Sequence, residues 1–161
     1  MTIWKDNVFF VLVGPSEWGN IGASARAVKN MGFSNLRVVN PPENGKEEAQ
    51  RFAYNAGDVL GSISVFGSLA DAISDVSIVI GTTRRKGRSR GVFYDPETGL
   101  KNIPALAKKN KVAIIFGRER TGLTNDEIEE CGSLITIPSD KKQPSLNLSH
   151  AVLIIAYALS R

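Results

Sequence analysis

Four segments of this chain combine glycine with side chains that can bind a ligand. Each follows a short apolar run, and together they hold glycines, hydroxyls, amides, a carboxylate and several arginines. In sheets of parallel strands, ligands bind at the carboxyl ends of the strands. We therefore expect one ligand site where these segments meet. The segments are residues 14–22, 81–90, 117–123 and 138–147.

The first segment is close to two nucleotide-binding loops but fits neither. For the phosphate-binding pattern GxxxxGK[ST], Gly14 and Gly19 fit, but Asn20 and Ile21 stand where Lys and Ser/Thr are required. The dinucleotide-binding pattern needs GxGxxG and an acidic residue after the second strand, and that strand is followed by residues 40–42, Asn-Pro-Pro. These mismatches argue against a P-loop NTPase and an NAD enzyme.

Composition narrows the remaining chemistry. The 161 residues are 42% hydrophobic and 22% charged, which is typical of one soluble globular domain. A single cysteine, Cys131, excludes an internal disulfide and a multi-cysteine cluster, and a single histidine, His150, argues against a histidine metal site or a Ser-His-Asp triad. We interpret both as packing residues and expect no metal. The net charge of +4 permits a polyanionic partner without requiring one.

Neither long apolar stretch is suited to a membrane. The run 151–159 is shorter than the roughly 20 residues that cross a bilayer. The run 8–13 is too short for the core of a signal peptide. The sequence therefore predicts a cytoplasmic protein with no membrane partner.

Apolar runs alternate with helical patterns along the chain. This alternation predicts an α/β fold with a mostly parallel sheet flanked by helices. We expect Asn20 to cap the first helix, Thr124 and Glu127 to form a capping box, and the last helix to be buried in the core or in a subunit interface. The predicted strands are 7–13, 36–39, 62–66, 76–80, 112–116 and 134–137, and the predicted helices are 19–31, 46–56, 68–75, 100–110, 124–131 and 146–160.

Three ordered motifs carry a family resemblance that runs from about residue 7 to the last residue. Segments 20–27, 116–123 and 137–149 resemble the three motifs of the SpoU/TrmH branch of the SPOUT RNA methyltransferases. The resemblance implies a single SPOUT methyltransferase domain over 1–161 with a deep C-terminal trefoil knot, which topology rules alone do not predict. Segments 30–36 and 117–125 are most similar to the branch members that methylate tRNA, which usually carry a C-terminal RNA-binding extension that is absent from this sequence.

The resemblance also implies an activity and its partners. The reaction is transfer of a methyl group from S-adenosyl-L-methionine to a ribose 2′-hydroxyl of tRNA, at nucleotide 32 of the anticodon loop. The family works as a homodimer, so Arg26 would serve either its own or the partner subunit's site. Two alternatives stay open: a 2′-O-methyltransferase acting on rRNA, and a non-catalytic RNA-binding relative that keeps the knot.

Carried over by motif, the cofactor site combines backbone groups with an apolar slot. Gly117 would allow close approach of the backbone to the cofactor, although an ordinary turn at a strand end explains it equally well. Ile137 would form an apolar wall. The implied cofactor-binding residues are Thr82, Thr83, Arg84, Gly117, Ile137, Pro144, Ser145 and Leu146.

Five residues are implied in catalysis, and each has a simpler alternative. Arg26 stays protonated, so we expect it to position the RNA and stabilise the developing alkoxide, with a solvated surface arginine as the alternative. The small neighbours of Arg26 would leave room for the RNA backbone. Asn20 would contact substrate or only cap its helix, and Glu119 would orient an arginine or the substrate or only form a salt bridge. Ser145 and Asn147 would line the site, cap the last helix, or both.

RNA contact is expected from one basic segment. Arg84, Arg85, Lys86, Arg88 and Arg90 follow a strand end at the expected ligand edge, where phosphate contact is favoured over a merely solvated loop. Trp18 would stack on a base or make a lid contact.

Overall fold

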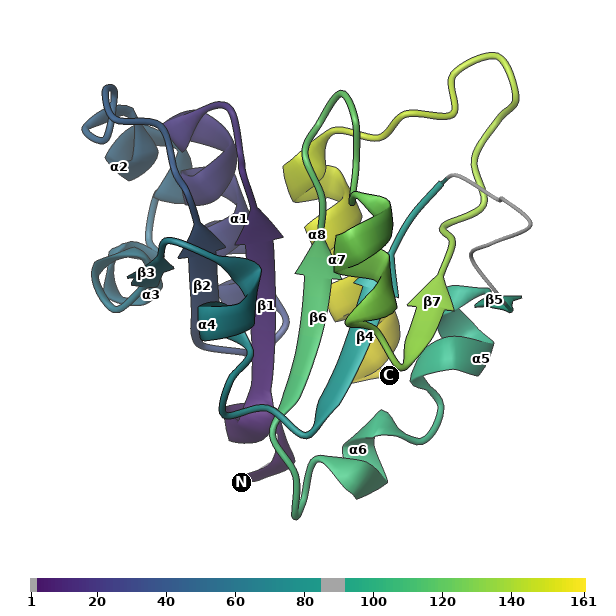
Figure 1. Cartoon of the computed structure of the whole chain (residues 1–161). Helices are drawn as coiled ribbons and strands as arrows, with labels where there is room; N and C mark the ends of the chain where they lie inside the picture. The colour runs from purple at the N-terminus through teal and green to yellow at the C-terminus, as the bar shows by residue number, and fades with distance from the viewer. Residues whose placement is uncertain (1–2, 85–91) are drawn as a thin grey trace.

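Seven strands form one sheet in the computed structural model, which describes residues 3–84 and 92–161 (Figure 1). Their order is β3-β2-β1-β6-β4-β7-β5, and every neighbouring pair is parallel, which confirms the predicted α/β fold. The strands are β1 Val8–Val13, β2 Asn35–Val39, β3 Ser64–Phe66, β4 Ile78–Thr82, β5 Phe93–Tyr94, β6 Val112–Phe116 and β7 Ser133–Ile135.

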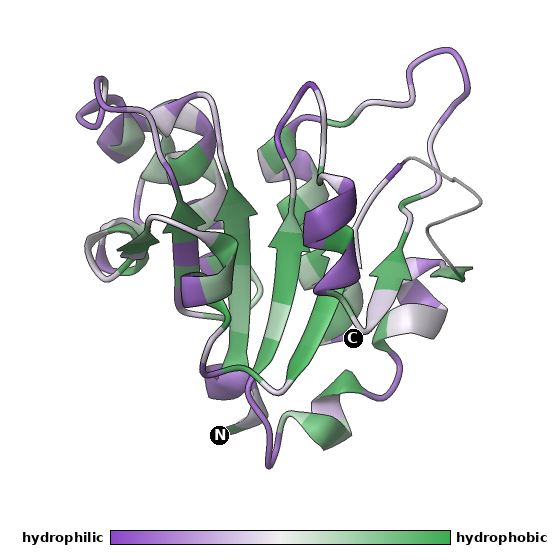
Figure 2. Cartoon of the chain, in the orientation of Figure 1, coloured by the Kyte–Doolittle hydropathy of each residue, from purple (hydrophilic) through white to green (hydrophobic). Residues whose placement is uncertain are grey.

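The sheet is covered on both faces because its central strands are apolar at every position (Figure 2). Successive side chains of a strand point to opposite faces. Phe10 and Leu12 of β1 therefore belong to one buried cluster, while Val11 and Val13 belong to the other. Helices contribute to both clusters. The first receives α1 (Trp18–Asn30), α2 (Glu48–Ala53), α3 (Gly57–Gly61) and α8 (Leu148–Ser160), and the second receives α4 (Leu69–Ala72) and α7 (Asn125–Glu129).

Most predicted elements are present, with shifted ends. The predicted helix 46–56 is shorter in the structure, because α2 ends at Ala53 and a turn at Tyr54 separates it from α3. The predicted helix 100–110 is replaced by two short helices, the first of which begins at Pro96. Strand β5 was not predicted because it has two residues. The helices are η1 Ile3–Asn7, α1 Trp18–Asn30, α2 Glu48–Ala53, α3 Gly57–Gly61, α4 Leu69–Ala72, α5 Pro96–Leu100, α6 Ile103–Leu106, α7 Asn125–Glu129 and α8 Leu148–Ser160.

Helix caps confirm two sequence predictions and contradict two. The capping box of Thr124 and Glu127 starts α7, and the Asn147 side chain accepts hydrogen bonds from two backbone N–H groups of α8. Asn20 is not a cap, because α1 begins at Trp18 and Asn20 lies inside its first turn. Ser145 is not a cap either, because α8 begins only at Leu148.

Helix α8 has one buried and one exposed apolar face. Val152, Ile155 and Leu159 are buried against the core, whereas Ile154 and Tyr157 are 38% and 49% exposed. A long connection between β7 and α8 passes over the upper rim of the sheet (Figure 1). The trefoil knot implied by the resemblance stays a prediction. No helix among the described residues is long and apolar enough to cross a membrane.

Candidate functional site

A cleft opens at the carboxyl ends of β4, β6 and β7, between their loops and the start of α8. Its cavity volume is about 110 Å³. All eight residues predicted to bind the cofactor line it, from Thr82 to Leu146. The other lining residues are Phe116, Arg118, Glu119, Gly122, Leu148 and Ala151.

The lining divides into an apolar wall and a polar rim. Phe116, Ile137, Leu146, Leu148 and Ala151 supply the apolar wall. Hydroxyl groups of two threonines and a serine, two guanidinium groups and one carboxylate supply the rim. Such a cleft suits a ligand that has an aromatic or aliphatic body and charged ends.

Glu119 joins all three sequence motifs through hydrogen bonds. Its carboxylate accepts from the backbone N–H of Ser16, from the Ser16 hydroxyl at 2.8 Å, and from the Asn20 side-chain amide at 3.1 Å. Asn147 in turn donates its amide N–H to the Asn20 carbonyl oxygen at 3.1 Å. Among the described residues, no arginine or lysine is bonded to this carboxylate, and the orientation of an arginine or of the substrate and the salt bridge of Glu119 stay predictions. The carboxylate fixes the α1 start to the cleft.

Arg118 holds the loop that carries Glu119, and the sequence analysis missed it. Its guanidinium forms two hydrogen bonds with the Glu127 carboxylate, at 2.9 and 3.0 Å. The backbones of Arg118 and Gly122 pair with each other and close the loop into a tight hairpin. Arg118 and Glu127 are nine residues apart in different elements, so neither a helical nor a strand period predicts that they pair.

Glu127 serves this hairpin and the helix behind it at the same time. Its carboxylate also accepts the backbone N–H of Thr124 at 2.7 Å in the capping box. Burial works to raise the pKa of the Glu127 carboxyl, but the hydrogen bonds from Arg118 and Thr124 outweigh it, and the pKa lies below its ordinary value. The pair therefore stays ionised at neutral pH.

Two glycines near the site are required by contacts within the chain. A side chain on Gly117 would collide with the backbone of Gly122 and Leu123, so the hairpin itself requires glycine there. A side chain on Gly22 would collide with the backbone carbonyl of Ala49 in α2. Gly22 therefore admits α2, which corrects the expectation that this residue leaves room for RNA.

Arg26 lies outside the cleft of its own chain. It is exposed on α1, six residues after Asn20, which corresponds to about 9 Å along the helix. Its guanidinium lies 5.1 Å from the ring centre of Tyr54. Among the described residues it forms no ion pair with a carboxylate.

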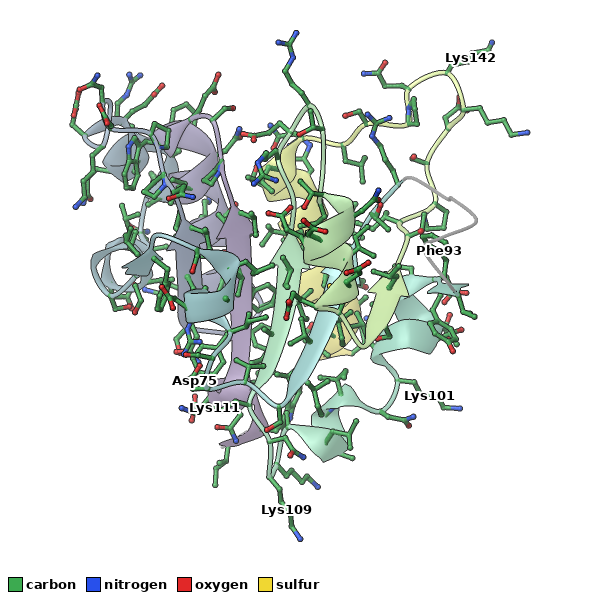
Figure 3. All side chains as sticks on the ribbon, in the orientation of Figure 1. Asp75, Phe93, Lys101, Lys109, Lys111 and Lys142 are labelled. Carbon is green, nitrogen blue, oxygen red and sulfur yellow. The ribbon has the colours of Figure 1, made fainter. Side chains whose placement is uncertain are left out.

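The predicted RNA-binding segment is described only at its start. Arg84 is exposed at the cleft, whereas Arg85, Lys86, Arg88 and Arg90 lie outside the described residues. Two basic side chains that were not predicted to bind RNA, Lys141 and Lys142, are exposed on the connection between β7 and α8, where Figure 3 labels Lys142. Their place in a long loop gave no regular pattern from which to predict them.

Three further predictions are settled by burial. Trp18 is 5% exposed and donates its indole N–H to the Pro42 carbonyl, so stacking on a base is wrong and the ring packs in the core. His150 is exposed, which contradicts a packing role. Cys131 packs against the second core cluster, and burial, with nearby Glu130 and Glu127, raises its pKa to about 12.

Within residues 3–84 and 92–161, no cluster of three or more His, Cys, Asp or Glu could hold a metal ion.

Comparison with known proteins identifies the family. The model described as the SpoU rRNA Methylase family matches residues 7–157. The chain belongs to this family. A curated relative from Sodalis glossinidius, named tRNA (cytidine/uridine-2′-O-)-methyltransferase TrmJ, is 45% identical over 154 residues, which are 94% of this chain and 59% of the relative.

Solved structures of SpoU family members share the fold. TrmJ from Z. mobilis ZM4 superposes with a TM-score of 0.85 at 36% identity, covering 94% of this chain and 68% of that one. The SpoU methyltransferase AviRb from Streptomyces viridochromogenes, solved in complex with AdoMet, superposes with a TM-score of 0.75 at 20% identity, covering 97% of this chain and 60% of that one, and shows the shared fold. The chain spans about 60% of the length of the curated TrmJ relatives.

Proposed function

We propose that this chain transfers a methyl group from S-adenosyl-L-methionine to a ribose 2′-hydroxyl of tRNA. The observation that carries the proposal is the convergence of three distant motifs on one cleft, linked by hydrogen bonds through Asn20, Glu119 and Asn147. The names of the curated relatives, which specify 2′-O-methylation of tRNA, support the choice of substrate. We extend the proposal to nucleotide 32 and to action in the cytoplasm.

The residues of the cleft fit the proposed cofactor. The apolar wall of Ile137 and Leu146 offers a slot for the adenine ring, and the rim offers hydroxyl groups and charges of both signs for its ribose, amino and carboxylate groups. When bound, S-adenosyl-L-methionine supplies an electrophilic methyl group. Thr82, Thr83, Arg84, Gly117, Pro144 and Ser145 complete the proposed binding set.

The proposed roles of the protein are to hold the reactants and to stabilise charge. With the methyl donor held in this cleft, the methyl group would pass from its sulfur to the ribose oxygen, and the hydroxyl proton would leave to solvent. Arg26 remains protonated, so it binds the adjacent phosphate and stabilises the developing negative charge rather than accepting the proton. Glu119 and Asn147 keep the start of α1 against the cleft and so fix the approach of the sugar.

We further propose a homodimer in which Arg26 acts on the nucleotide at the partner subunit's cleft. Within one chain Arg26 does not line the cleft, which supports this arrangement. The exposed Ile154 and Tyr157 of α8 supply an apolar surface suited to a second copy.

Methyl transfer to separated RNAs tests this function. With S-adenosyl-L-methionine labelled in the methyl group, we expect label in tRNA and none in rRNA, and mapping should place a 2′-O-methyl group at nucleotide 32. The rRNA arm is needed because the family description names rRNA. Label found only in rRNA would show that the substrate is rRNA instead of tRNA. Binding of tRNA without methyl transfer or cofactor binding would favour the non-catalytic alternative.

A further inference from the structure

Tyr54 occupies a backbone conformation that is unusual for its residue type. The Ala56 N–H donates to the Ala53 carbonyl at 2.9 Å and closes a four-residue turn between α2 and α3. Tyr54 is the first central residue of this turn, with φ 53° and ψ −117°, the conformation of that position in a type II′ turn. Glycine is the usual residue there, because a side chain makes this conformation strained. A tyrosine therefore needs another reason to be present.

The core does not provide that reason. Tyr54 is 69% exposed, and its ring centre lies 5.1 Å from the guanidinium of Arg26. An exposed contact of this kind between a cation and a ring stabilises a fold only weakly. The exposed ring is thus better explained by a ligand than by the stability of the chain.

A second exposed aromatic ring lies against the same face of α1. Gly19, Gly22 and Arg26 are spaced three and four residues apart and so lie along one stripe of the helix. The Phe52 ring packs over Gly19, where an added side chain would come within 3.2 Å of it, and Phe52 is itself 46% exposed. The two rings therefore extend along α1 from Arg26 toward Asn20, which is part of the site described above.

The segment that carries the Phe52 and Tyr54 rings is held firmly against α1. The α2 backbone at Ala49 packs directly on Gly22, leaving no room for a side chain. Lys29 of α1 donates to the carbonyl of Asn55 in the turn at 2.9 Å and pairs with Asp58 at the same distance. Rings fixed in this way lose little conformational freedom when a flat ligand stacks on them.

We infer that Tyr54, together with Arg26 and Phe52, forms a platform on which a nucleobase of single-stranded RNA stacks next to the methylated ribose. This inference rests on the proposed function, which brings RNA to Arg26. Exposed aromatic rings beside an arginine bind unpaired bases through their faces, while the guanidinium binds the neighbouring phosphate. Binding through ring faces tolerates different bases, so the platform positions the strand without selecting its sequence.

Replacing Tyr54 with glycine separates RNA binding from stability. Tyr54→Gly removes the ring and also relieves the strained backbone, so the thermal midpoint should equal or exceed that of the unchanged protein. The dissociation constant for an anticodon stem-loop RNA, measured by fluorescence anisotropy, should rise about tenfold, as expected for loss of one stacked base. The affinity for S-adenosylhomocysteine should not change.

Two control variants isolate the ring. Tyr54→Phe keeps the ring face and should bind the RNA within about twofold of the unchanged protein. Asn40→Gly relieves the other positive φ of a non-glycine residue in the described chain, φ 50°, on an exposed loop, and should leave RNA binding unchanged.

Three results would overturn the platform. The first is that Tyr54→Gly binds the RNA within twofold of the unchanged protein, and the second is that the unchanged protein does not bind the RNA. The third is that Tyr54→Gly loses a dimer in analytical ultracentrifugation, which would assign the ring to a contact between copies. Failure of the proposed function is distinguishable, because it would leave RNA binding dependent on Tyr54 but give no methyl transfer.

Discussion

Arg26 and Arg37 both place a guanidinium near an aromatic ring, but on opposite faces of the sheet and in different surroundings. The Arg37 side chain is 12% exposed, lies 3.9 Å from the ring centre of Phe9, and binds the Asp75 carboxylate through two hydrogen bonds. Arg26 is exposed, and its ring partner, Tyr54, is exposed as well. Asp75 and the nearby Lys111 lie at the end of the sheet opposite the cleft (Figure 3).

The difference between the two arginines separates stability from function. The Arg37 guanidinium donates three hydrogen bonds within the chain, two to the Asp75 carboxylate and one to the Ala72 carbonyl. A cation whose partners are all internal stabilises the fold and has little capacity left for a ligand. Arg26, without a carboxylate partner in the described part of the chain, is available to a phosphate.

The largest expected effect is on methyl transfer by Arg26→Ala. Loss of a cation that stabilises the developing alkoxide should lower kcat on the order of a hundredfold or more. The free energy of unfolding should stay within about 0.5 kcal/mol, because the side chain is on the surface. Methylation kinetics and urea denaturation of the same preparation measure both. Near-normal turnover would remove Arg26 from the reaction.

Arg37→Ala should have the reverse effect. It removes three hydrogen bonds, two to Asp75 and one to the Ala72 carbonyl, and the contact with Phe9, so we expect a loss of about 2 kcal/mol in the free energy of unfolding. At a temperature where the variant stays folded, its turnover should match that of the unchanged protein. A stable but inactive variant would contradict the comparison.

A smaller effect is expected at the hairpin behind the cleft. Glu127→Gln weakens the pair with Arg118 without changing a residue that lines the cleft, so the affinity for S-adenosylhomocysteine should fall about fivefold by calorimetry. Glu129→Gln is a matched control on the exposed side of the same helix and should bind normally. Equal affinities for the two variants would show that the hairpin holds its shape without the pair.

The smallest effect is a change in acid stability. Hydrogen bonds from Arg37 and Lys111 lower the pKa of the Asp75 carboxyl well below its ordinary value, although burial opposes them. A lowered folded-state pKa stabilises the protein above the ordinary value of about 4 and loses this stabilisation as the pH falls below it. Between pH 4 and pH 2, the thermal midpoint of Asp75→Asn should therefore fall less than that of the unchanged protein. Parallel curves would assign acid sensitivity to other carboxylates.

The sequence predicted the elements that have a clear period or a continuous apolar run. Strands such as β6 are buried at every position, so unbroken apolar runs locate them. The order of motifs at strand ends also placed all eight predicted cofactor residues around one cleft. Both predictions follow from local patterns plus the geometry of a parallel sheet.

Features created by contacts between distant segments were not predictable. The distance between Asn20 and Glu119 in sequence hides the hydrogen bond that uses the Asn20 amide, so a helix cap was the natural prediction. Trp18 packs in the core and donates its indole N–H to the distant Pro42 carbonyl, and no local pattern indicates that. The turn at Tyr54 ends a predicted helix early, at a residue type that favours neither a positive φ nor turns.

A crystal structure with S-adenosylhomocysteine would test the central claim most directly. The account predicts the molecule in the cleft at the carboxyl ends of β4, β6 and β7, with its adenine against Ile137 and Leu146. A molecule bound elsewhere, or a cleft that stays empty at saturating concentration, would contradict the account.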